Sequence, residues 1–361
     1  MNEANYLVNP VFYGSESYSK INQYIEDKKP SSVFILVDTN TQQNCLGLFL
    51  KNITTELQIE VIEIEPGEEN KHIETCTGVW SALSELGADR KSLMINLGGG
   101  VVTDLGGFVA STFKRGIPFI NVPTTLLSMV DASVGGKTGV DLGNLKNQVG
   151  VIVQAELVVV DSKYLQTLSS REMRSGLAEI LKHGLIADES YWNSMSNLSS
   201  LDLSDLDTII EHSVNIKSEI VSQDPYERSI RKNLNFGHTL GHAVESFYLT
   251  NSEKDKLLHG EAIAIGMILE SYLSYEILNF PQKKLRDISN IIIDLFGFTD
   301  ISTEDLNQII SLLKHDKKNS NGQVNFVLLK DIAVPELDVI VSEELIIKSF
   351  DFYNSLNITN H

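Results

Sequence analysis

The sequence predicts an α/β domain built on a parallel sheet, followed by a mostly helical domain. In the first half, short apolar runs rich in β-branched residues alternate with helix-like segments, as in a sheet covered on both faces. After about residue 168 this strand pattern nearly stops, and apolar residues recur at helical spacing. A chain of 361 residues also exceeds one average domain. We therefore expect a Rossmann-like α/β domain over residues 1–168 and a helical domain over residues 169–361.

The strands expected in the first domain are apolar runs without alternation, as buried parallel strands require. They are residues 32–38, 60–65, 93–97, 119–122 and 157–160. Helices are expected between them, at residues 44–53, 71–86 and 103–113.

In the second domain, helical spacing predicts helices at residues 171–188, 205–222, 239–248, 261–278, 282–296 and 303–315. A strand pair at residues 324–329 and 339–341 and a helix at residues 343–356 complete the expected elements. Residues 199–207 have the composition of a polar surface turn.

Composition excludes several classes of partner. The net charge of −19 and a pI near 4.8 argue against binding to nucleic acid or to an anionic membrane, since both need a basic face. Two cysteines, Cys45 and Cys76, cannot build a disulfide framework and suit a reducing compartment. We expect no signal peptide and no membrane span, because no apolar run approaches ~18 residues. The expected location is the cytoplasm.

A glycine-rich stretch at residues 97–147 carries the first chemical signal. Gly98, Gly99 and Gly100 follow a predicted strand, and a helix-like segment containing Asp104 comes next. Without a Cβ, backbone N–H groups can approach a phosphate closely, and a helix N-terminus attracts an anion. The pattern therefore predicts a dinucleotide or phosphate cradle. A tight turn in an ordinary α/β protein fits the glycines alone equally well.

A later part of this stretch, Gly136-Lys137-Thr138, is not a P-loop. That motif needs a glycine five residues before Gly136, and the residue there is Asp131. A kinase or NTPase is accordingly poorly supported.

Two groups of residues in the second domain have the chemistry of a metal site. His238 and His242 lie one helical turn apart on one face, a spacing that can chelate a metal but also occurs in plain helices. Glu179, Lys182 and His183 gather on one face of another helix, although a Glu-x-x-Lys pair is common on surfaces. Spacing alone favours His238, His242 and one carboxylate as ligands.

Four segments resemble, in order, the motifs of the 3-dehydroquinate synthase family of sugar phosphate cyclases: GGGVVTDLGGFVASTFKRG, VPTTLLSMVDASVGGKTGVD, LKNQVG and DPYERSIRKNLNFGHTLGH. The resemblance covers roughly residues 33–330. It implies an NAD- and metal-dependent phosphorus–oxygen lyase that converts 3-deoxy-D-arabino-heptulosonate 7-phosphate to 3-dehydroquinate and phosphate, on the shikimate route to aromatic amino acids. The implied reaction comprises transient NAD-dependent oxidation, β-elimination of phosphate, reduction and intramolecular aldol closure.

The resemblance changes the expected ligand set. It implies zinc or cobalt held by Glu179, His238 and His259, with His242 facing the substrate. Three protein ligands leave open positions, as a catalytic zinc requires.

The resemblance also implies three further groups of site residues. Catalytic roles fall to Lys182, Asp131, Glu227, His242 and Lys137. Substrate binding falls to Arg115, Lys146, Asn147, Lys217, Arg231, Asn235 and Lys317. Contacts with NAD fall to Asp38, Asn40, Glu68, Lys71, Gly99, Gly100, Asp104, Thr124, Thr125, Lys137, Lys146 and Thr167.

Within these groups, Arg231 and Lys217 would lie near the substrate carboxylate. Arg115 resembles the family arginine that reaches a neighbouring subunit's phosphate site, which implies a homodimer. The chain departs from the family pattern at Leu145 and Ser229, where glycine is usual, so the geometry of two loops is in question.

Three rival functions are less well supported. A cyclase for a substrate without a carboxylate would not need both Arg231 and Lys217. A metal-dependent polyol dehydrogenase would release NADH and would not need the full set of cations. A non-catalytic NAD- or metal-binding protein would have lost catalytic positions, and none is missing.

Overall fold

The computed structural model describes residues 8–143, 145–195, 205–313 and 324–357. They form two compact units, here called the first and the second unit. The first unit comprises Met1–Met173 and Asp202–Pro225, and the second comprises Arg174–Leu201 and Tyr226–His361.

This division differs in one element from the predicted one. The helix expected at residues 205–222 is present as α8 (Leu206–Gln223) but belongs to the first unit, where it packs against the helical turn at Ser128–Ala132. The domain limits at residues 168 and 169 stay a prediction.

The first unit is built on a six-stranded parallel sheet in the order β1-β8-β5-β4-β2-β3. Its strands are β1 (Val11–Tyr13), β2 (Val33–Asp38), β3 (Ile59–Ile64), β4 (Leu93–Gly98), β5 (Phe119–Pro123) and β8 (Val158–Val160). Every side chain of β4 is buried, as the unbroken apolar run predicts. All five strands expected in this sheet are confirmed, and of its six strands only the three-residue β1 was not predicted.

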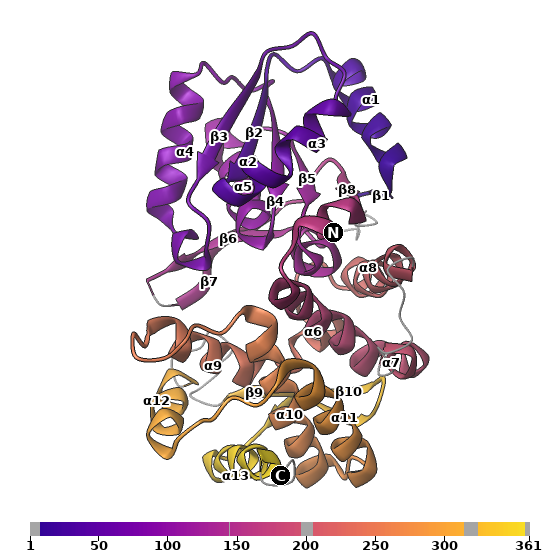
Figure 1. The fold of residues 1–361 in the computed structure, drawn as a ribbon, viewed down its shortest axis with the longest axis vertical. Coiled ribbons are helices and arrows are strands. Elements are labelled where there is room, and N and C mark those ends of the chain that lie inside the picture. The colour runs from indigo at the N-terminus through magenta and orange to yellow at the C-terminus, as the bar shows by residue number, and fades with distance from the viewer. Residues whose placement is uncertain (1–7, 144, 196–204, 314–323, 358–361) are drawn as a thin grey trace. The chain divides into compact units, whose positions relative to one another are not determined.

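The first unit also contains helices, several of which pack against this sheet. They are α1 (Tyr18–Lys28), α2 (Thr39–Asn44), α3 (Leu46–Lys51), α4 (Ile73–Glu85), α5 (Gly100–Thr112) and α8. In the view of Figure 1, α4 and α1 run along opposite sides of the strands. The helix predicted at residues 44–53 is present as the shorter α3. The preceding α2 was not predicted, and it begins immediately after β2 because Asp38 caps it by accepting the Thr41 N–H at 2.8 Å.

A hairpin formed by β6 (Lys137–Leu142) and β7 (Leu145–Ile152) was not predicted. In the sequence, its glycines are typical of a loop. In the structure, Gly139 and Gly150 face each other across the hairpin, where the two backbones come very close. A Cβ on Gly139 would lie 2.6 Å from the Val149 carbonyl oxygen, and one on Gly150 would lie 2.4 Å from the Thr138 carbonyl oxygen. Glycine here serves a close approach of two backbones rather than a turn.

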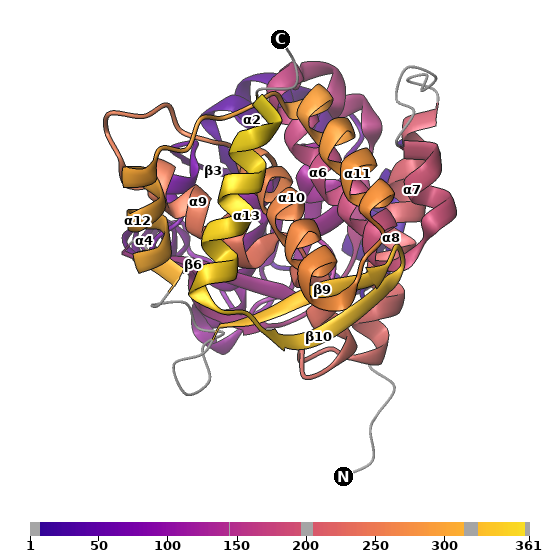
Figure 2. The same cartoon turned by 90° about the horizontal axis from the view of Figure 1, so that it is seen from below.

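The second unit is mostly helical. Its helices are α6 (Ser170–Ala187), α7 (Glu189–Met195), α9 (His238–Thr250), α10 (His259–Leu278), α11 (Gln282–Phe296), α12 (Thr303–Leu313) and α13 (Glu343–Ser355). The first residues of α6, up to Met173, belong to the first unit. The strands β9 (Asn325–Asp331) and β10 (Val334–Ile340) form an antiparallel pair. Figure 2 shows α10 between α11 and α13, which explains why α10 is apolar nearly all round. The expected helices and the strand pair are confirmed, and α7 was missed. Residues 199–204 and 314–315 of the predicted elements lie outside the described residues.

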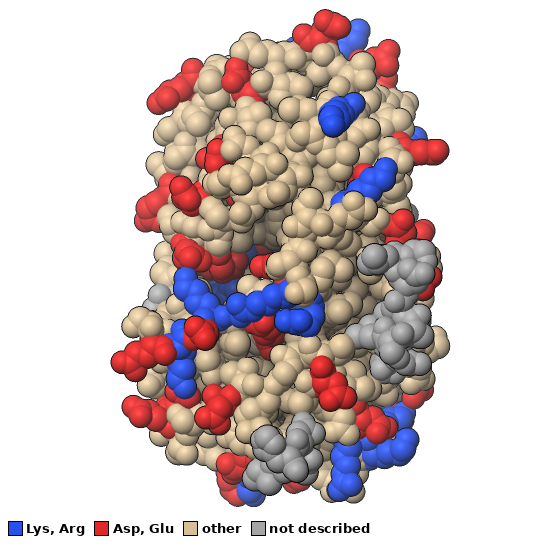
Figure 3. Space-filling model, in the orientation of Figure 1, with Lys and Arg blue, Asp and Glu red and all other residues tan. Residues whose placement is uncertain are grey.

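Two surface properties bear on function. Acidic side chains are scattered over the face shown in Figure 3, in keeping with the net charge of −19. Among the described residues, no helix is long and apolar enough to span a bilayer.

The hairpin gives the first testable prediction. We expect Gly150→Ala to destabilise the protein by about 1–3 kcal/mol, because its Cβ would meet a backbone oxygen that cannot move without disrupting the β6–β7 ladder. Thermal unfolding followed by circular dichroism measures this. The matched control is Gly78→Ala on the exposed face of α4, where a Cβ meets no atom within 4 Å, so stability should hold or rise by up to about 1 kcal/mol. Equal unfolding temperatures for the two variants would contradict the role given to Gly150.

Candidate functional site

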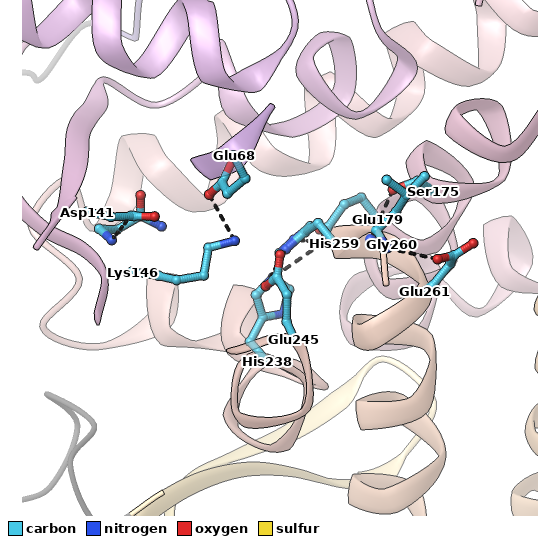
Figure 4. Close-up of polar contacts among 12 residues, drawn as sticks. Glu68, Asp141, Lys146, Ser175, Glu179, His238, Glu245, His259, Gly260 and Glu261 are labelled. Carbon is cyan, nitrogen blue, oxygen red and sulfur yellow. Dashed lines mark hydrogen bonds and ion pairs between the residues drawn. The ribbon is translucent and has the colours of Figure 1, made fainter. Parts of the chain in front are cut away.

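Three helices of the second unit bring a carboxylate and imidazoles together (Figure 4). Glu179 comes from the middle of α6, while His238 and His259 are the first residues of α9 and α10. Glu179 Oε1 lies 3.3 Å from His238 Nε2 and 3.4 Å from His259 Nε2. One turn along α9, His242 joins them, and ligand nitrogens of the three histidines lie within 4.8 Å of one another.

A close helix contact makes this convergence possible. The Gly260 N–H donates to Ser175 Oγ at 3.0 Å, which joins the start of α10 to α6. A Cβ on Gly260 would lie 2.0 Å from the Ser175 carbonyl oxygen, so no other residue fits there. The contact lies one residue from His259 and one helical turn from Glu179, and it therefore sets how closely these two side chains approach.

The two imidazole rings are oriented from their far sides. His238 Nδ1 lies 3.1 Å from the Phe236 carbonyl oxygen, and His259 Nδ1 lies 3.3 Å from Glu245 Oε2. If each Nδ1 carries the proton and donates it to these acceptors, each Nε2 turns its lone pair toward Glu179. Glu245 was missed in the sequence, although it follows His238 by seven residues and so shares its helix face.

The charges of this cluster suit a cation site. Glu179 is fully buried and forms an ion pair with Lys182. Burial by itself would raise the pKa of Glu179, but Lys182 and His238 outweigh it and hold that pKa well below its ordinary value. Burial, with Lys182 nearby, lowers the pKa of His238. Glu179 is therefore ionised and His238 neutral at neutral pH, the states in which both can bind a metal.

His259 differs from His238. Burial acts to lower its pKa, but Glu245 and Glu179 prevail and raise the pKa of His259 to about 9. A metal entering the cluster would displace this proton. One carboxylate oxygen with imidazole nitrogens is a donor set that zinc and similar divalent ions accept, so these residues fit such an ion.

In the first unit, charged side chains surround the segment before α4 and the hairpin. Lys71 is buried, and its Nζ lies 2.7 Å from Asp104 Oδ2 and 2.8 Å from Asn147 Oδ1. Lys146 Nζ lies 2.9 Å from Glu68 Oε1, as Figure 4 shows. Burial would lower the pKa of Lys71, but Asp104 and Glu68 outweigh it and raise that pKa. Four residues expected at the cofactor, Glu68, Lys71, Asp104 and Lys146, are thus brought together with Asn147, which was expected at the substrate.

Asp141 fixes the geometry of this cluster and was not foreseen. Its Oδ1 accepts the Asn147 N–H at 2.6 Å, and its own N–H donates to the Lys71 carbonyl oxygen at 2.8 Å. Asn147 has a left-handed backbone (φ 51°), which this short bond helps to hold. Asp141 therefore ties the hairpin to the segment that carries Lys71.

The glycine turn after β4 opens α5, three residues earlier than predicted. Gly99 is the N-cap of this 13-residue helix, and Gly100 is its first residue. A Cβ on Gly99 would come within 3.0 Å of Thr125 Cγ2, so its absence keeps the space between the turn and the end of β5 open. A helix N-terminus that begins with two glycines fits the pyrophosphate of a dinucleotide.

Other expected cofactor residues lie at the carboxyl ends of strands. Asp38 ends β2, with Asn40 in the helix after it, and Thr124 is buried just beyond β5. Thr167 donates its hydroxyl to the Tyr164 carbonyl oxygen at 2.8 Å.

Expected substrate residues form two smaller groups, one in each unit. In the first, Lys217 Nζ contacts Asp131 twice, at 2.6 Å to Oδ1 and 2.7 Å to the carbonyl oxygen. In the second, Asn235 Nδ2 donates to Glu227 Oε1 at 2.7 Å, while Arg231 is buried nearby in the chain.

The positions of two further expected residues can be given, whereas a third is not described. Arg115 lies beyond α5 in a left-handed backbone (φ 73°), and Lys137 is exposed at the start of β6. Lys317 lies outside the described residues.

Sequence comparison adds independent findings. The family model for the N-terminal domain of 3-dehydroquinate synthase matches residues 61–175. The model for the C-terminal domain of the same enzyme matches residues 176–319. The chain is 41% identical to 3-dehydroquinate synthase of Parabacteroides distasonis, over 93% of this chain and 95% of that protein. It is 36% identical to the Dictyoglomus thermophilum protein of the same name, over 94% of each chain.

A solved structure is similar over the whole chain. It is 2-epi-5-epi-valiolone synthase from Streptomyces hygroscopicus subsp. jinggangensis 5008 with NAD⁺ and Zn²⁺ bound. The TM-score is 0.84 at 25% identity, over 98% of this chain and 99% of that one.

The orientation of His259 by Glu245 leads to a second prediction. Glu245→Gln should weaken binding of Zn²⁺ about 10–100-fold, because a neutral amide accepts the ring N–H more weakly than a carboxylate and no longer increases the basicity of the ring. Competition with a chromogenic chelator measures the dissociation constant. Glu253→Gln, an exposed change of the same charge just beyond α9, is the control and should bind as the wild type does. Indistinguishable affinities for the two variants would show that Glu245 does not support the ligand.

Proposed function

The chain belongs to the 3-dehydroquinate synthase family, and we propose that it converts 3-deoxy-D-arabino-heptulosonate 7-phosphate into 3-dehydroquinate and phosphate. The observation that carries this proposal is the close cluster of Glu179, His238 and His259, the ligand set that the family resemblance implies. The relatives that carry this name match nearly the full chain, which supports the same conclusion.

The metal would be held by Glu179, His238 and His259, with His242 beside it. Zinc and cobalt both suit these donors. Such an ion, when bound, acts as a Lewis acid that polarises a substrate oxygen. Lys182 keeps Glu179 ionised, so the carboxylate is ready to bind without losing a proton first.

NAD would be held by the turn at Gly99 and Gly100 and by the N-terminus of α5. The NAD⁺ in the solved relative supports this assignment. Bound NAD⁺ supplies a hydride acceptor and, once reduced, a hydride donor. Asp38, held in place by the Thr41 N–H, would bind ribose hydroxyls and disfavour the additional phosphate of NADP. The remaining proposed contacts are those named from the sequence: Asn40, Glu68, Lys71, Asp104, Thr124, Thr125, Lys137, Lys146 and Thr167.

The substrate carries two anionic groups, and the proposed contacts are cationic or hydrogen-bonding. Lys217 and Arg231 would bind its carboxylate, and Lys182 and Asp131 its hydroxyls. For the phosphate, the proposed residues are Lys146, Asn147, Asn235, His242 and Lys317. Glu227 and Lys137 complete the proposed catalytic set. Lys217 is preorganised by its two contacts with Asp131, and Asn235 by its bond to Glu227.

We also propose a homodimer that acts in the cytoplasm. Lys114, Arg115 and Gly116 all have positive φ, so the backbone after α5 is held in a conformation that residues other than glycine rarely adopt. Strain of this kind persists where a side chain must be presented in one direction. It supports a role for Arg115 at the phosphate site of a second copy of the chain.

One assay distinguishes the proposed reaction from its rivals. We expect purified protein given the heptulosonate 7-phosphate, catalytic NAD⁺ and Zn²⁺ to release phosphate and form dehydroquinate in equal amounts without net NADH. Absence of phosphate release would redirect the assignment to uncarboxylated sugar phosphates. NADH that accumulates without phosphate would indicate a dehydrogenase.

A variant tests the ligand assignment directly. Glu179→Gln should lower Zn²⁺ affinity at least about 100-fold and abolish turnover, because a neutral amide replaces the anionic ligand. Equilibrium dialysis with metal analysis reports binding, and circular dichroism reports the fold, which should persist. Glu253→Gln again serves as the control. Near-normal metal content and turnover in Glu179→Gln would rule out this ligand set.

A further inference from the structure

The helix that carries His238 begins without a capping side chain of its own. Its N-cap is Gly237, which has a left-handed backbone (φ 76°) and no side chain to accept a hydrogen bond. The first N–H groups of any helix have no partner within the helix and need acceptors elsewhere. In α9 these groups flank His238.

Glu270, from the middle of α10, supplies the acceptors. Its Oε2 accepts the Gly237 N–H at 2.6 Å, and its Oε1 accepts the Leu240 N–H at 3.1 Å. These N–H groups are at the N-cap and N3 positions, the two that a capping box satisfies with local side chains. In this chain one carboxylate from another helix, with an exposed fraction of 0%, satisfies both.

The same two helices touch backbone to backbone at this point. A Cβ on Gly266 of α10 would lie 1.9 Å from the Gly237 carbonyl oxygen, and one on Gly241 of α9 would lie 3.1 Å from the Ala262 carbonyl oxygen. Packing this close permits one register between the helices, and the two bonds of Glu270 fix the start of α9 in it. His238 Nε2 is thereby placed relative to His259 on α10.

The charge of Glu270 has a second effect. His238 and His259 are each the first residue of a helix, so two partially positive helix ends lie beside the proposed cation. At the start of α10 the chain's own Glu261 accepts the Leu258 N–H at 2.8 Å. At the start of α9, Glu270 accepts the corresponding N–H, that of Gly237. Both helix ends that present metal ligands therefore carry a carboxylate, which offsets their repulsion of a cation.

We propose that Glu270 is a positioning residue of the metal centre, which holds His238 in place by capping α9 and neutralises the positive end of that helix. This inference rests on the metal site of the proposed function. Glu270 acts on the ion through His238 and α9.

The test is the variant Glu270→Gln, compared with the wild type in metal affinity and in the visible spectrum of the Co²⁺-loaded protein. The amide keeps the size of the side chain, but its NH₂ group must face one of the two N–H donors, and the charge is lost. We expect the dissociation constant for Zn²⁺ to rise at least about tenfold. The Co²⁺ absorption should change as well, because the ligand geometry shifts.

A matched control separates positioning from stability. Ser274 lies one turn further along α10, is buried, and accepts the Leu329 N–H of β9 at 2.9 Å. Ser274→Ala leaves that N–H without its acceptor and removes the bond from the Ser274 hydroxyl to the Glu270 carbonyl oxygen at 2.6 Å. It thus destabilises the same helix but does not touch the two bonds of the Glu270 carboxylate to α9. Its unfolding temperature should fall, while its Zn²⁺ affinity should stay within about twofold of the wild type, with an unchanged Co²⁺ spectrum.

Each outcome decides the proposal. A Glu270→Gln protein with wild-type affinity and spectrum would overturn it, as would an equal loss of affinity in Ser274→Ala. If Glu270→Gln does not fold, Glu270→Asp applies the same criteria, since the shorter carboxylate keeps the charge but cannot make both bonds. A wild-type protein that binds neither Zn²⁺ nor Co²⁺ would contradict the proposed function itself, before any variant is compared.

Discussion

The geometry of the cluster of Glu179, His238 and His259 depends on the burial of one carboxylate. Removing the Glu179 charge from water costs several kcal/mol unless cations and hydrogen bonds compensate for it. Lys182 on the same helix supplies one positive charge, and His238 and His259 approach from two other helices. Three helices must therefore converge, which they do through contacts so close that only glycine fits, as at Gly260. Chemistry and packing impose the same geometry here, because a helix that moved away would leave the charge without compensation.

In the first unit, it is lysine side chains that are paired with carboxylates. Lys71, Lys146 and Lys217 each face a carboxylate of the same unit, so each of these three side chains has a counter-charge. In a chain with a net charge of −19, this arrangement retains positive side chains at places where an anionic ligand is proposed to bind. An incoming phosphate or carboxylate would compete with the protein's own carboxylates for the lysines. Affinity for the anion is then set by exchange of partners rather than by the overall field.

Much of the fold could be predicted because its signals are local. Unbroken apolar runs predicted β2, β3, β4, β5 and β8, and helical spacing predicted α9 to α13. The β6–β7 hairpin was missed because Gly139 and Gly150 resemble loop residues, and only the facing strand explains them. For the site, the motifs predicted which residues face a ligand, and several of them, such as Glu179, His238 and His259, lie close together in the structure. Glu245, Asp141 and Glu270 could not be identified, because what defines each is a partner that only the folded chain brings close.

His238 and His259 are the first residues of their helices, and this position explains why several carboxylates lie near them. Side chains on a helix lean toward its N-terminus, so a first-turn imidazole projects beyond the helix end, where it can meet groups from other elements. The same location brings unpaired N–H groups and positive partial charge close to a proposed cation. Glu270 and Glu261 accept hydrogen bonds from N–H groups at the two helix ends and offset their positive charge. Glu245 orients the His259 ring, and Glu179 faces both imidazoles. Four acidic side chains around one site thus serve distinct physical purposes, and losing any of them should weaken the site in a different way.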